Sequence, residues 1–198
     1  MKKSTRAAAF LVGILSGIMV MGCRNDGPVS GTVSDHRNNP AIAESDCGVV
    51  TPISLPRSRG PKPVVTASVI VTPQKGGRVD TVMQYMNAST GQIVLVHAIL
   101  SVPAGGVNGT KTITMTIDTS VVGVKFGPQG LRFLRVSLFS LEAYNLDPIP
   151  SGANIGFYFF DDVGGKEPES WSSMRVTPTS IKMAGGTVPH FSRYAFGR

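Results

Sequence analysis

Histidine, cysteine and tryptophan are scarce in this sequence, which holds three, two and one of them in 198 residues. His36 and His97 do not stand at the spacing of metal ligands, and no acid or cysteine lies close to His97 along the chain. A Gly-x-Ser-x-Gly elbow is also missing, as is a glycine-rich loop that opens a helix. The sequence therefore predicts no metal ion, no cofactor and no enzymatic activity. A Ser–His–Asp arrangement assembled from distant positions stays open.

A 3.6-residue apolar period is missing after residue 22, so no helix is expected there. Short apolar or alternating runs take its place, and turn residues separate them about every 8–12 residues. This pattern predicts an all-β fold, a single antiparallel β-sandwich. We expect its strands at 64–72, 78–85, 93–102, 111–118, 120–126, 131–141, 155–160, 171–177, 179–183 and 188–196.

Three of these runs indicate which side chains fill the sandwich. Within 111–118, three threonines alternate with three apolar residues, so the apolar row should face inward and the hydroxyl row outward. The run 93–102 is apolar on both faces, which indicates a central strand. The four aromatic residues of 155–160 are expected to fill the core as well.

Two glycine-rich segments should reverse the chain. The proline and the last glycine of 127–130 suit a type I turn, after which Phe133, Val136 and Leu138 are expected to re-enter the core. Residues 184–186, Ala-Gly-Gly, are expected to turn the chain into the last strand.

The first 22 residues differ in composition from the rest. Three basic residues precede an uncharged apolar run at 7–22, which is short for a membrane span and typical of a signal-peptide core. The run ends at Cys23 in the sequence VMGC, which resembles a bacterial lipobox. We therefore predict a signal peptide at 1–22 and a lipid-modified Cys23 that anchors the protein in the cell envelope. The alternative is an uncleaved anchor helix with an incidental cysteine.

The residues after this anchor refine the prediction. Arg24 follows Cys23 where an aspartate would favour retention in the inner membrane, so the outer membrane is favoured if the cell has one. If Cys23 is acylated, Cys47 has no partner for a disulfide within the chain. The stability of the fold must then come from its hydrophobic core, without a disulfide.

A flexible tether is expected between the anchor and the domain. Residues 24–62 are rich in Asn, Asp, Ser, Gly and Pro and contain no aromatic residue, so they bury little apolar surface. We assign residues 23–62 to the lipidated cysteine and this tether, and residues 63–198 to the β-sandwich. Val49, Val50 and Ile53 could still dock on a sheet edge.

The charge of the chain is small once the signal peptide is removed. Without the three basic residues of 1–22, there remain 16 basic and 12 acidic residues, a net charge of +4. We interpret two small clusters, Arg132 with Arg135 and Arg57 with Arg59 and Lys62, as solvated surface. Their functional alternative is attraction to anionic lipid or polysaccharide. No dense basic stretch with interleaved aromatics occurs, which argues against a nucleic-acid partner.

The order of turns and strands resembles that of a known family. In this chain the resemblance is carried by four segments, TPQKGGRV at 72–79, VPAGGV at 102–107, GPQGLRF at 127–133 and HFS at 190–192. They look like those of the domain named after the zonula occludens proteins and the uncoordinated-five netrin receptors (the ZU-five domain). Such domains also occur in ankyrins, in death-domain signalling proteins and in many bacterial surface lipoproteins. The resemblance spans residues 64–196, with Arg135 where the family usually has proline, and implies a β-sandwich.

The His190-Phe191-Ser192 segment carries one possible reaction. In some death-domain members of the resembled family this tripeptide is a self-cleavage site, which implies Ser192 as nucleophile, His190 as general base and a cut at the Phe191–Ser192 bond. Within one strand, residues 190 and 192 would share a face. A cut would release only residues 192–198, so we expect a structural role, with Phe191 in the core and the polar pair at the rim.

The function expected from these features is that of a membrane-anchored, non-enzymatic protein-interaction or scaffold module. An envelope protein or a glycan would bind at exposed strand edges and at the rim loops 103–110, 142–153 and 161–170. The self-cleaving module is the first alternative. A carbohydrate-binding sandwich is the second, and it rests on Trp171 and Tyr144 alone.

Overall fold

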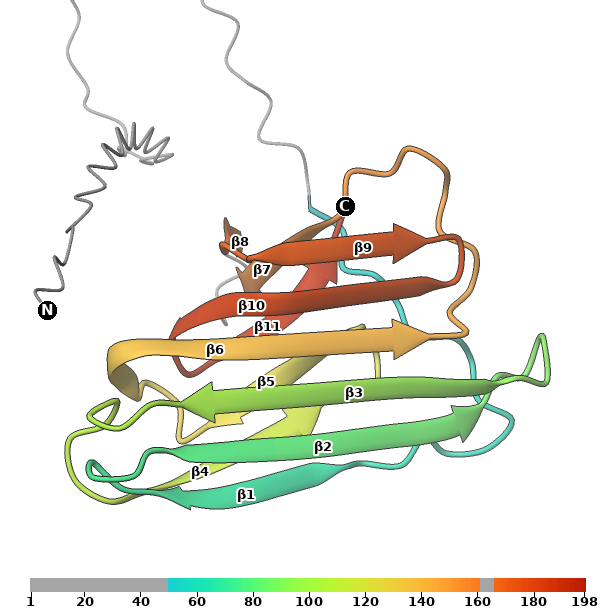
Figure 1. Ribbon diagram of the computed structural model, residues 1–198. Coiled ribbons are helices and arrows are strands. Elements are labelled where there is room, and N and C mark those ends of the chain that lie inside the picture. Colours follow the sequence, from blue (N-terminus) through green and yellow to red (C-terminus); the bar gives the residue numbers. More distant parts are fainter. Residues whose placement is uncertain (1–49, 161–165) are drawn as a thin grey trace, which may run out of the picture. The chain divides into compact units, whose positions relative to one another are not determined.

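The computed structural model describes residues 50–160 and 166–198, which contain β-strands and no helix (Figure 1). The predicted signal peptide, Cys23 and the first part of the predicted tether lie outside these ranges. Across the described part, no helix has the length and hydropathy needed to cross a bilayer. The strands are β1 (Thr66–Val71), β2 (Gly77–Met86), β3 (Ile93–Val102), β4 (Lys111–Ile117), β5 (Gly123–Gly127), β6 (Arg132–Tyr144), β7 (Gly156–Phe160), β8 (Lys166–Pro168), β9 (Ser173–Thr177), β10 (Ser180–His190) and β11 (Arg193–Gly197).

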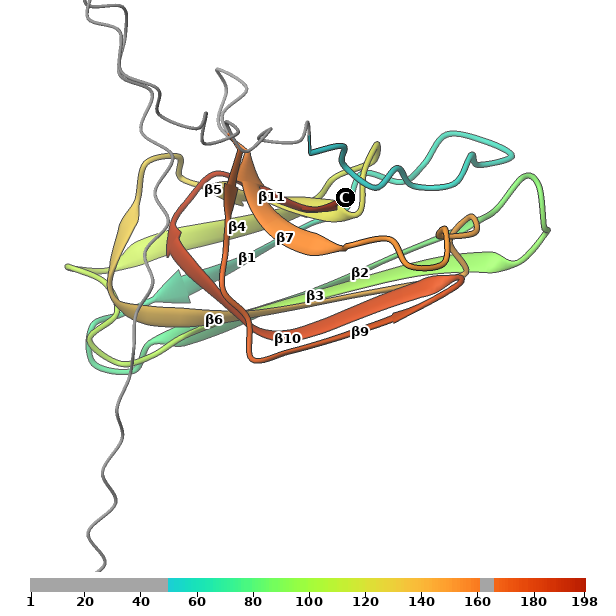
Figure 2. The ribbon, with the colours of Figure 1, turned by 90° about the horizontal axis from the view of Figure 1, so that it is seen from above.

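The strands form two antiparallel sheets that pack face to face, as the view from above shows (Figure 2). The six-stranded sheet has the order β1-β4-β5-β11-β7-β8, and the five-stranded sheet has the order β2-β3-β6-β10-β9. The predicted all-β sandwich is therefore confirmed. The strand between β7 and β9, the short β8, was not expected from the sequence.

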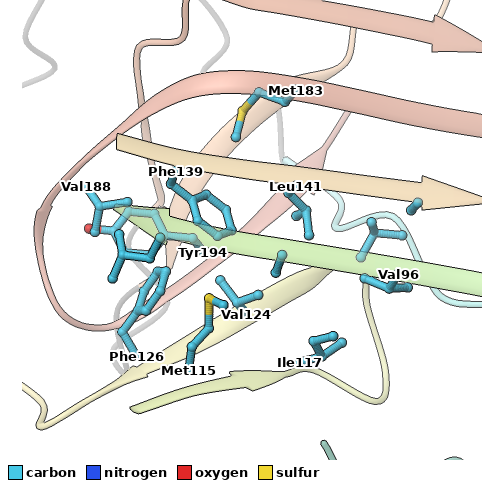
Figure 3. Packing of buried hydrophobic residues seen from close by; sticks show 14 of the residues in the cluster. Val96, Met115, Ile117, Val124, Phe126, Phe139, Leu141, Met183, Val188 and Tyr194 are labelled. Atoms are coloured by element: carbon cyan, nitrogen blue, oxygen red, sulfur yellow. The ribbon is translucent and has the colours of Figure 1, made fainter. Parts of the chain in front are cut away.

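The core lies between the two sheets and follows the alternation of the sequence. Ile113, Met115 and Ile117 of β4 are buried, while the threonines between them face outward, as predicted. Phe126 of β5 meets Phe139 of β6 edge to face, with ring centroids 5.4 Å apart (Figure 3). Residues of the two sheets thus interlock through large apolar side chains.

β3 is an interior strand, as its two-faced apolar sequence predicted. It pairs with β2 on one side and with β6 on the other. The prediction for 155–160 was only partly right. Phe157 is buried in the core, but Phe160 belongs to a separate small cluster with Val121 and Ala195, because successive side chains of a strand point to opposite faces.

The last third of the chain corrects the prediction for 184–186. These residues are not a turn between strands, because β10 continues through them to His190. Its register with β6 shifts by one residue between Met183 and Gly186, and Gly185 has φ of +66°. The segment is a β-bulge, a conformation that glycine adopts without steric cost.

The turn after β5 is displaced by one residue from its predicted position. The amide of Leu131 donates to the carbonyl oxygen of Pro128 at 3.3 Å, and Gly130 has φ of +78°. A positive φ at the third position is the requirement of a type II turn rather than type I. The hydrogen-bonded turn therefore covers residues 128–131 instead of 127–130.

The domain begins earlier than the predicted boundary at residue 63. The amide of Ile53 donates to the carbonyl oxygen of Phe196 at 2.9 Å, and the carbonyl oxygen of Ile53 accepts from Val122 at 2.8 Å. Leu55 is buried in the core. Residues 50–62 therefore belong to the sandwich rather than to the tether, because the few aliphatic side chains in this segment find a sheet to cover.

Lys62 holds the segment 50–62 against the sandwich. It is therefore not part of the solvated cluster with Arg57 and Arg59 that the sequence had indicated. Its Nζ donates to the carbonyl oxygens of Thr119 at 2.9 Å and Leu55 at 3.3 Å, and lies 5.3 Å from the centroid of the Tyr85 ring. Partial burial disfavours the charged amine and lowers the pKa of Lys62, although Asp118 and Asp147 act in the opposite direction.

Candidate functional site

The His190-Phe191-Ser192 segment forms the corner at which the chain passes from one sheet to the other. His190 ends β10 of the five-stranded sheet, and Arg193 begins β11 of the six-stranded sheet. The expectation that residues 190 and 192 share a face of one strand is therefore wrong. The reversal occurs at residues 191 and 192, because 184–186 do not turn the chain.

Phe191 fills the core at this corner, as predicted. Its ring stacks on Phe126 with centroids 5.3 Å apart and meets Phe133 edge to face at 4.8 Å. Its amide donates to the carbonyl oxygen of Leu131 at 2.8 Å, and its own carbonyl oxygen accepts from the amide of Gly130 at 3.2 Å. Both backbone polar groups of Phe191 are thus hydrogen-bonded to the turn after β5.

The side chain of His190 is engaged with aromatic neighbours rather than with Ser192. Tyr194 Oη donates to the His190 carbonyl oxygen at 2.8 Å and lies 3.3 Å from His190 Nδ1. The imidazole also meets the Phe159 ring with centroids 4.5 Å apart. No hydrogen bond joins His190 to Ser192 within the described part of the chain.

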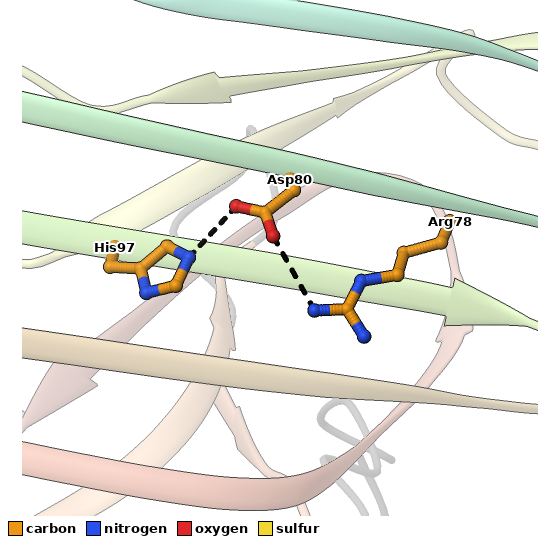
Figure 4. Close-up of polar contacts among 3 residues, drawn as sticks. All are labelled: Arg78, Asp80 and His97. Atoms are coloured by element: carbon orange, nitrogen blue, oxygen red, sulfur yellow. Dashed lines mark hydrogen bonds and ion pairs between the residues drawn. The ribbon is translucent and has the colours of Figure 1, made fainter.

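A second polar group lies on the outer face of the five-stranded sheet, where sequence reasoning expected none. His97 Nε2 donates to Asp80 Oδ1 at 2.8 Å, and Arg78 Nη2 lies 3.4 Å from Asp80 Oδ2 (Figure 4). The sequence separates Asp80 from His97 by 17 positions, but the antiparallel pairing of β2 and β3 brings them together. The interpretation that His97 has no acid nearby is corrected by this pairing.

Glu142 of β6 stands directly across from His97 in register and extends this polar row. Lys182 Nζ lies 3.0 Å from Glu142 Oε1, and Tyr144 Oη donates to Glu142 Oε2 at 2.8 Å. Burial alone would raise the pKa of Glu142, but the hydrogen bonds from Tyr144 and Lys182 outweigh it and lower that pKa. The pKa of Asp80 is also lowered, since its bonds with His97 and Arg78 outweigh its burial. Both carboxylates therefore stay charged at neutral pH and already have partners.

Large aliphatic side chains surround this polar row on the same outer face. Five of the ten exposed large hydrophobic side chains in the described ranges lie there, namely Val82, Met86, Ile93, Val136 and Leu138. Exposed Leu134 continues them along β6, in the irregular stretch between its pairings with β10 at Arg132 and Ser137. Outward residues of an antiparallel sheet are ordinarily polar when that face is solvated. This face departs from that rule at its two ends, because Met86 pairs with Ile93 at one end of β3 and Leu138 pairs with Ser101 at the other. Exposed apolar patches mark interaction sites.

The longest continuous part of this surface is on β6. Leu134, Val136 and Leu138 occupy alternate positions and are 66%, 66% and 51% exposed; we call these three residues the aliphatic row. The expectation that Val136 and Leu138 enter the core is wrong, because the register of β6 turns Ser137 and Phe139 inward instead. The alternation of side chains in 132–144 allows either face of this strand to point toward the core. Only the pairing with β10 decides which face does so.

The outer face of the six-stranded sheet has a different character. Thr66, Thr112, Thr114 and Thr116 face outward there, and the hydroxyls of Thr66 and Thr116 are 2.8 Å apart. Ile70 is its one strongly exposed aliphatic side chain within the described strands, at 65%. The two outer faces are therefore unequal, one rich in hydroxyls and the other in aliphatic groups.

Parts of the predicted rim loops are buried or belong to strands. The loop 103–110 is anchored by buried Val107 and by a 2.7 Å hydrogen bond from the Gly105 amide to the Pro73 carbonyl oxygen. The loop predicted at 142–153 begins only after Tyr144, and its Leu146 is buried. Of 161–170, residues 161–165 lie outside the described ranges and 166–168 form β8.

The two aromatic residues proposed for carbohydrate do not form a row. Tyr144 stands opposite Ser180, which pairs with Thr177 at the end of β9, whereas Trp171 precedes the start of that strand. Within the described ranges, no three His, Cys, Asp or Glu residues gather into a group that could hold a metal ion.

Comparisons of the chain with protein-family models, with curated proteins and with solved structures found no match.

Proposed function

We propose that this chain is a lipid-anchored envelope protein whose sandwich is a non-enzymatic interaction or scaffold module. In this proposal, residues 1–22 are a signal peptide, Cys23 carries the lipid, and the outer membrane is the destination if the cell has one. The partner is a second envelope protein that docks on the outer face of the five-stranded sheet. The observation that supports this docking surface is the aliphatic row on β6, which water would otherwise cover.

The chemistry of this surface favours a protein partner over a glycan. Glycan-binding faces present aromatic rings, whereas the aliphatic row has none and Tyr144 is held by Glu142. Aliphatic groups bind an apolar patch of another protein through burial of surface. Arg132, exposed at the start of β6, would suit an acidic group at the rim of that patch. The resemblance of the turn order to the ZU-five domain favours the same kind of module.

The self-cleaving module remains the second candidate, since the Gly130 amide donates to the Phe191 carbonyl oxygen that would carry the developing charge. Against it, Tyr194 rather than Ser192 is the hydrogen-bond partner of His190. We therefore expect the intact mass of the full chain to include residues 192–198 and to be unaffected, apart from the mass of the substitution, by Ser192→Ala. A chain shortened by those seven residues, and restored in length by Ser192→Ala, would establish cleavage instead.

A photo-crosslinking residue at position 136 tests the docking surface. In the full chain, expressed in its own cells, we expect position 136 to give a discrete adduct with another envelope protein. Position 70 is the matched control, because Ile70 is equally exposed but lies on the other outer face. Adding Leu134→Ser and Leu138→Ser should abolish the adduct formed from position 136. The docking proposal fails if positions 136 and 70 give the same adducts.

A further inference from the structure

Two cations face each other on the outer side of the six-stranded sheet. Lys125 of β5 and Arg193 of β11 are direct partners in the antiparallel register, and their side chains are 59% and 38% exposed. Like charges at directly opposite positions destabilise a sheet. Their pairing therefore calls for a negative group that offsets the repulsion.

Asp118 offsets only part of it. Its Oδ1 accepts from the backbone amides of Ser120 at 2.8 Å and Val121 at 3.3 Å, which fix the carboxylate in place. Its Oδ2 lies 3.1 Å from Arg193 Nε and 3.7 Å from Lys125 Nζ, and the side chain is 4% exposed. One buried carboxylate thus serves two cations, which leaves the three groups with a net charge of +1. No other acid forms an ion pair with them in the described part of the chain.

The free side of the cation pair opens into a depression of about 260 Å³. Lys125, Arg193, Gln129 and Ser192 line it together with Phe126, so its polar side chains are an ammonium, a guanidinium, an amide and a hydroxyl. Asp118 does not line it and instead lines a neighbouring depression, to which Lys125 and Arg193 also contribute. Guanidinium and ammonium groups with neutral donors beside them are the usual partners of phosphoryl oxygens.

We propose that this depression binds a phosphate group, with Lys125 and Arg193 as its cationic ligands. Gln129 and Ser192 would contribute neutral hydrogen bonds, and Asp118, which lies outside this depression, competes with the phosphate for the two cations. The phosphate can belong to a soluble phosphorylated molecule or to a lipid headgroup. This site lies on the sheet opposite to the aliphatic row, and it does not depend on the docking proposal.

Titration of the full chain in neutral detergent micelles with inorganic phosphate, at constant ionic strength, tests the site. Amide shifts at Lys125 and Arg193 should saturate, and Lys125→Gln should weaken the affinity about fivefold. Lys75→Gln, which removes the same charge from the exposed β1–β2 turn, should leave the affinity unchanged. Asp118→Asn keeps the Oδ1 acceptor but removes the competing charge, so it should raise the affinity about fivefold.

The source of the phosphate is distinguished by doping the micelles with phosphatidylglycerol or with phosphatidylcholine. If Lys125→Gln weakens retention on the phosphatidylglycerol micelles more than Lys75→Gln does, the group belongs to an anionic headgroup. If only binding of inorganic phosphate distinguishes the two variants, it belongs to a soluble molecule. Equal effects of both variants in every arm, or no saturation at about 50 mM phosphate, would overturn the proposal.

Discussion

Replacing Phe157 with alanine is expected to cost about 3–5 kcal/mol of the free energy of unfolding, enough to threaten the folded state of a marginally stable domain. Phe157 is fully buried, and its ring stacks on Phe139 at 5.6 Å and on Tyr194 at 5.7 Å between centroids. These contacts join β7 and β11 of one sheet to β6 of the other. Removing the ring leaves a cavity at the middle of the sandwich.

Urea unfolding of the full chain, followed by far-ultraviolet circular dichroism, measures this loss. Phe157→Leu is the matched variant, because it keeps an apolar side chain of intermediate volume and should lose clearly less stability. If Phe157→Ala cost no more than about 1 kcal/mol, the core would not be organised around this ring.

Gly76→Ala is the second variant with a large expected effect, a loss of about 3 kcal/mol or more. Gly76 has φ of +69°, and an added Cβ would collide with the carbonyl oxygen of Val102 and lie 2.6 Å from the carbonyl carbon of Pro103. The turn at 72–76 carries the chain from the six-stranded sheet to the five-stranded sheet, and the segment 102–106 packs against it. A shift at this corner would therefore disturb both sheets.

The loss expected for Gly76→Ala has two causes, the positive φ of the backbone and the collision of the added Cβ with the segment 102–103. Gly109→Ala separates them. Gly109 also has a positive φ, +79°, but nothing lies within 4 Å of the position of an added Cβ. Gly109→Ala should therefore lower the free energy of unfolding by only about 1–2 kcal/mol, the cost of a left-handed backbone conformation for alanine. Equal unfolding midpoints for Gly76→Ala and Gly109→Ala would show that the close approach of the two corner segments is not present.

The fold class could be predicted because its signal is local. The alternation of residues 111–117, the two-faced apolar run at 93–102 and the regular turn residues each indicate strands without knowledge of their neighbours. The same kind of signal led to a wrong prediction at 184–186, because glycine is suited to a β-bulge as well as to a turn. Turn residues indicate a change of backbone conformation, but they do not distinguish a reversal from a kink.

The candidate surfaces could not be predicted in the same way, because they depend on pairing between distant strands. Val136 and Leu138 have the composition of core residues, and only the register with β10 turns them outward. Lys125 and Arg193 are 68 positions apart in the sequence and become neighbours only when β5 pairs with β11. A hydrophobic pattern that contradicts the final register is where we expect a surface with a use beyond folding.

Chemical footprinting of the aliphatic row tests the central claim most directly, since it asks whether this surface is covered where the protein works. Carbene labelling of Leu134, Val136 and Leu138 would be compared between native membranes and the purified full chain, with Ile70 as the internal reference. We expect labelling of the three residues to fall several-fold in membranes while labelling of Ile70 stays constant. Unchanged labelling of the row, relative to Ile70, would contradict the assignment of this face as the docking surface.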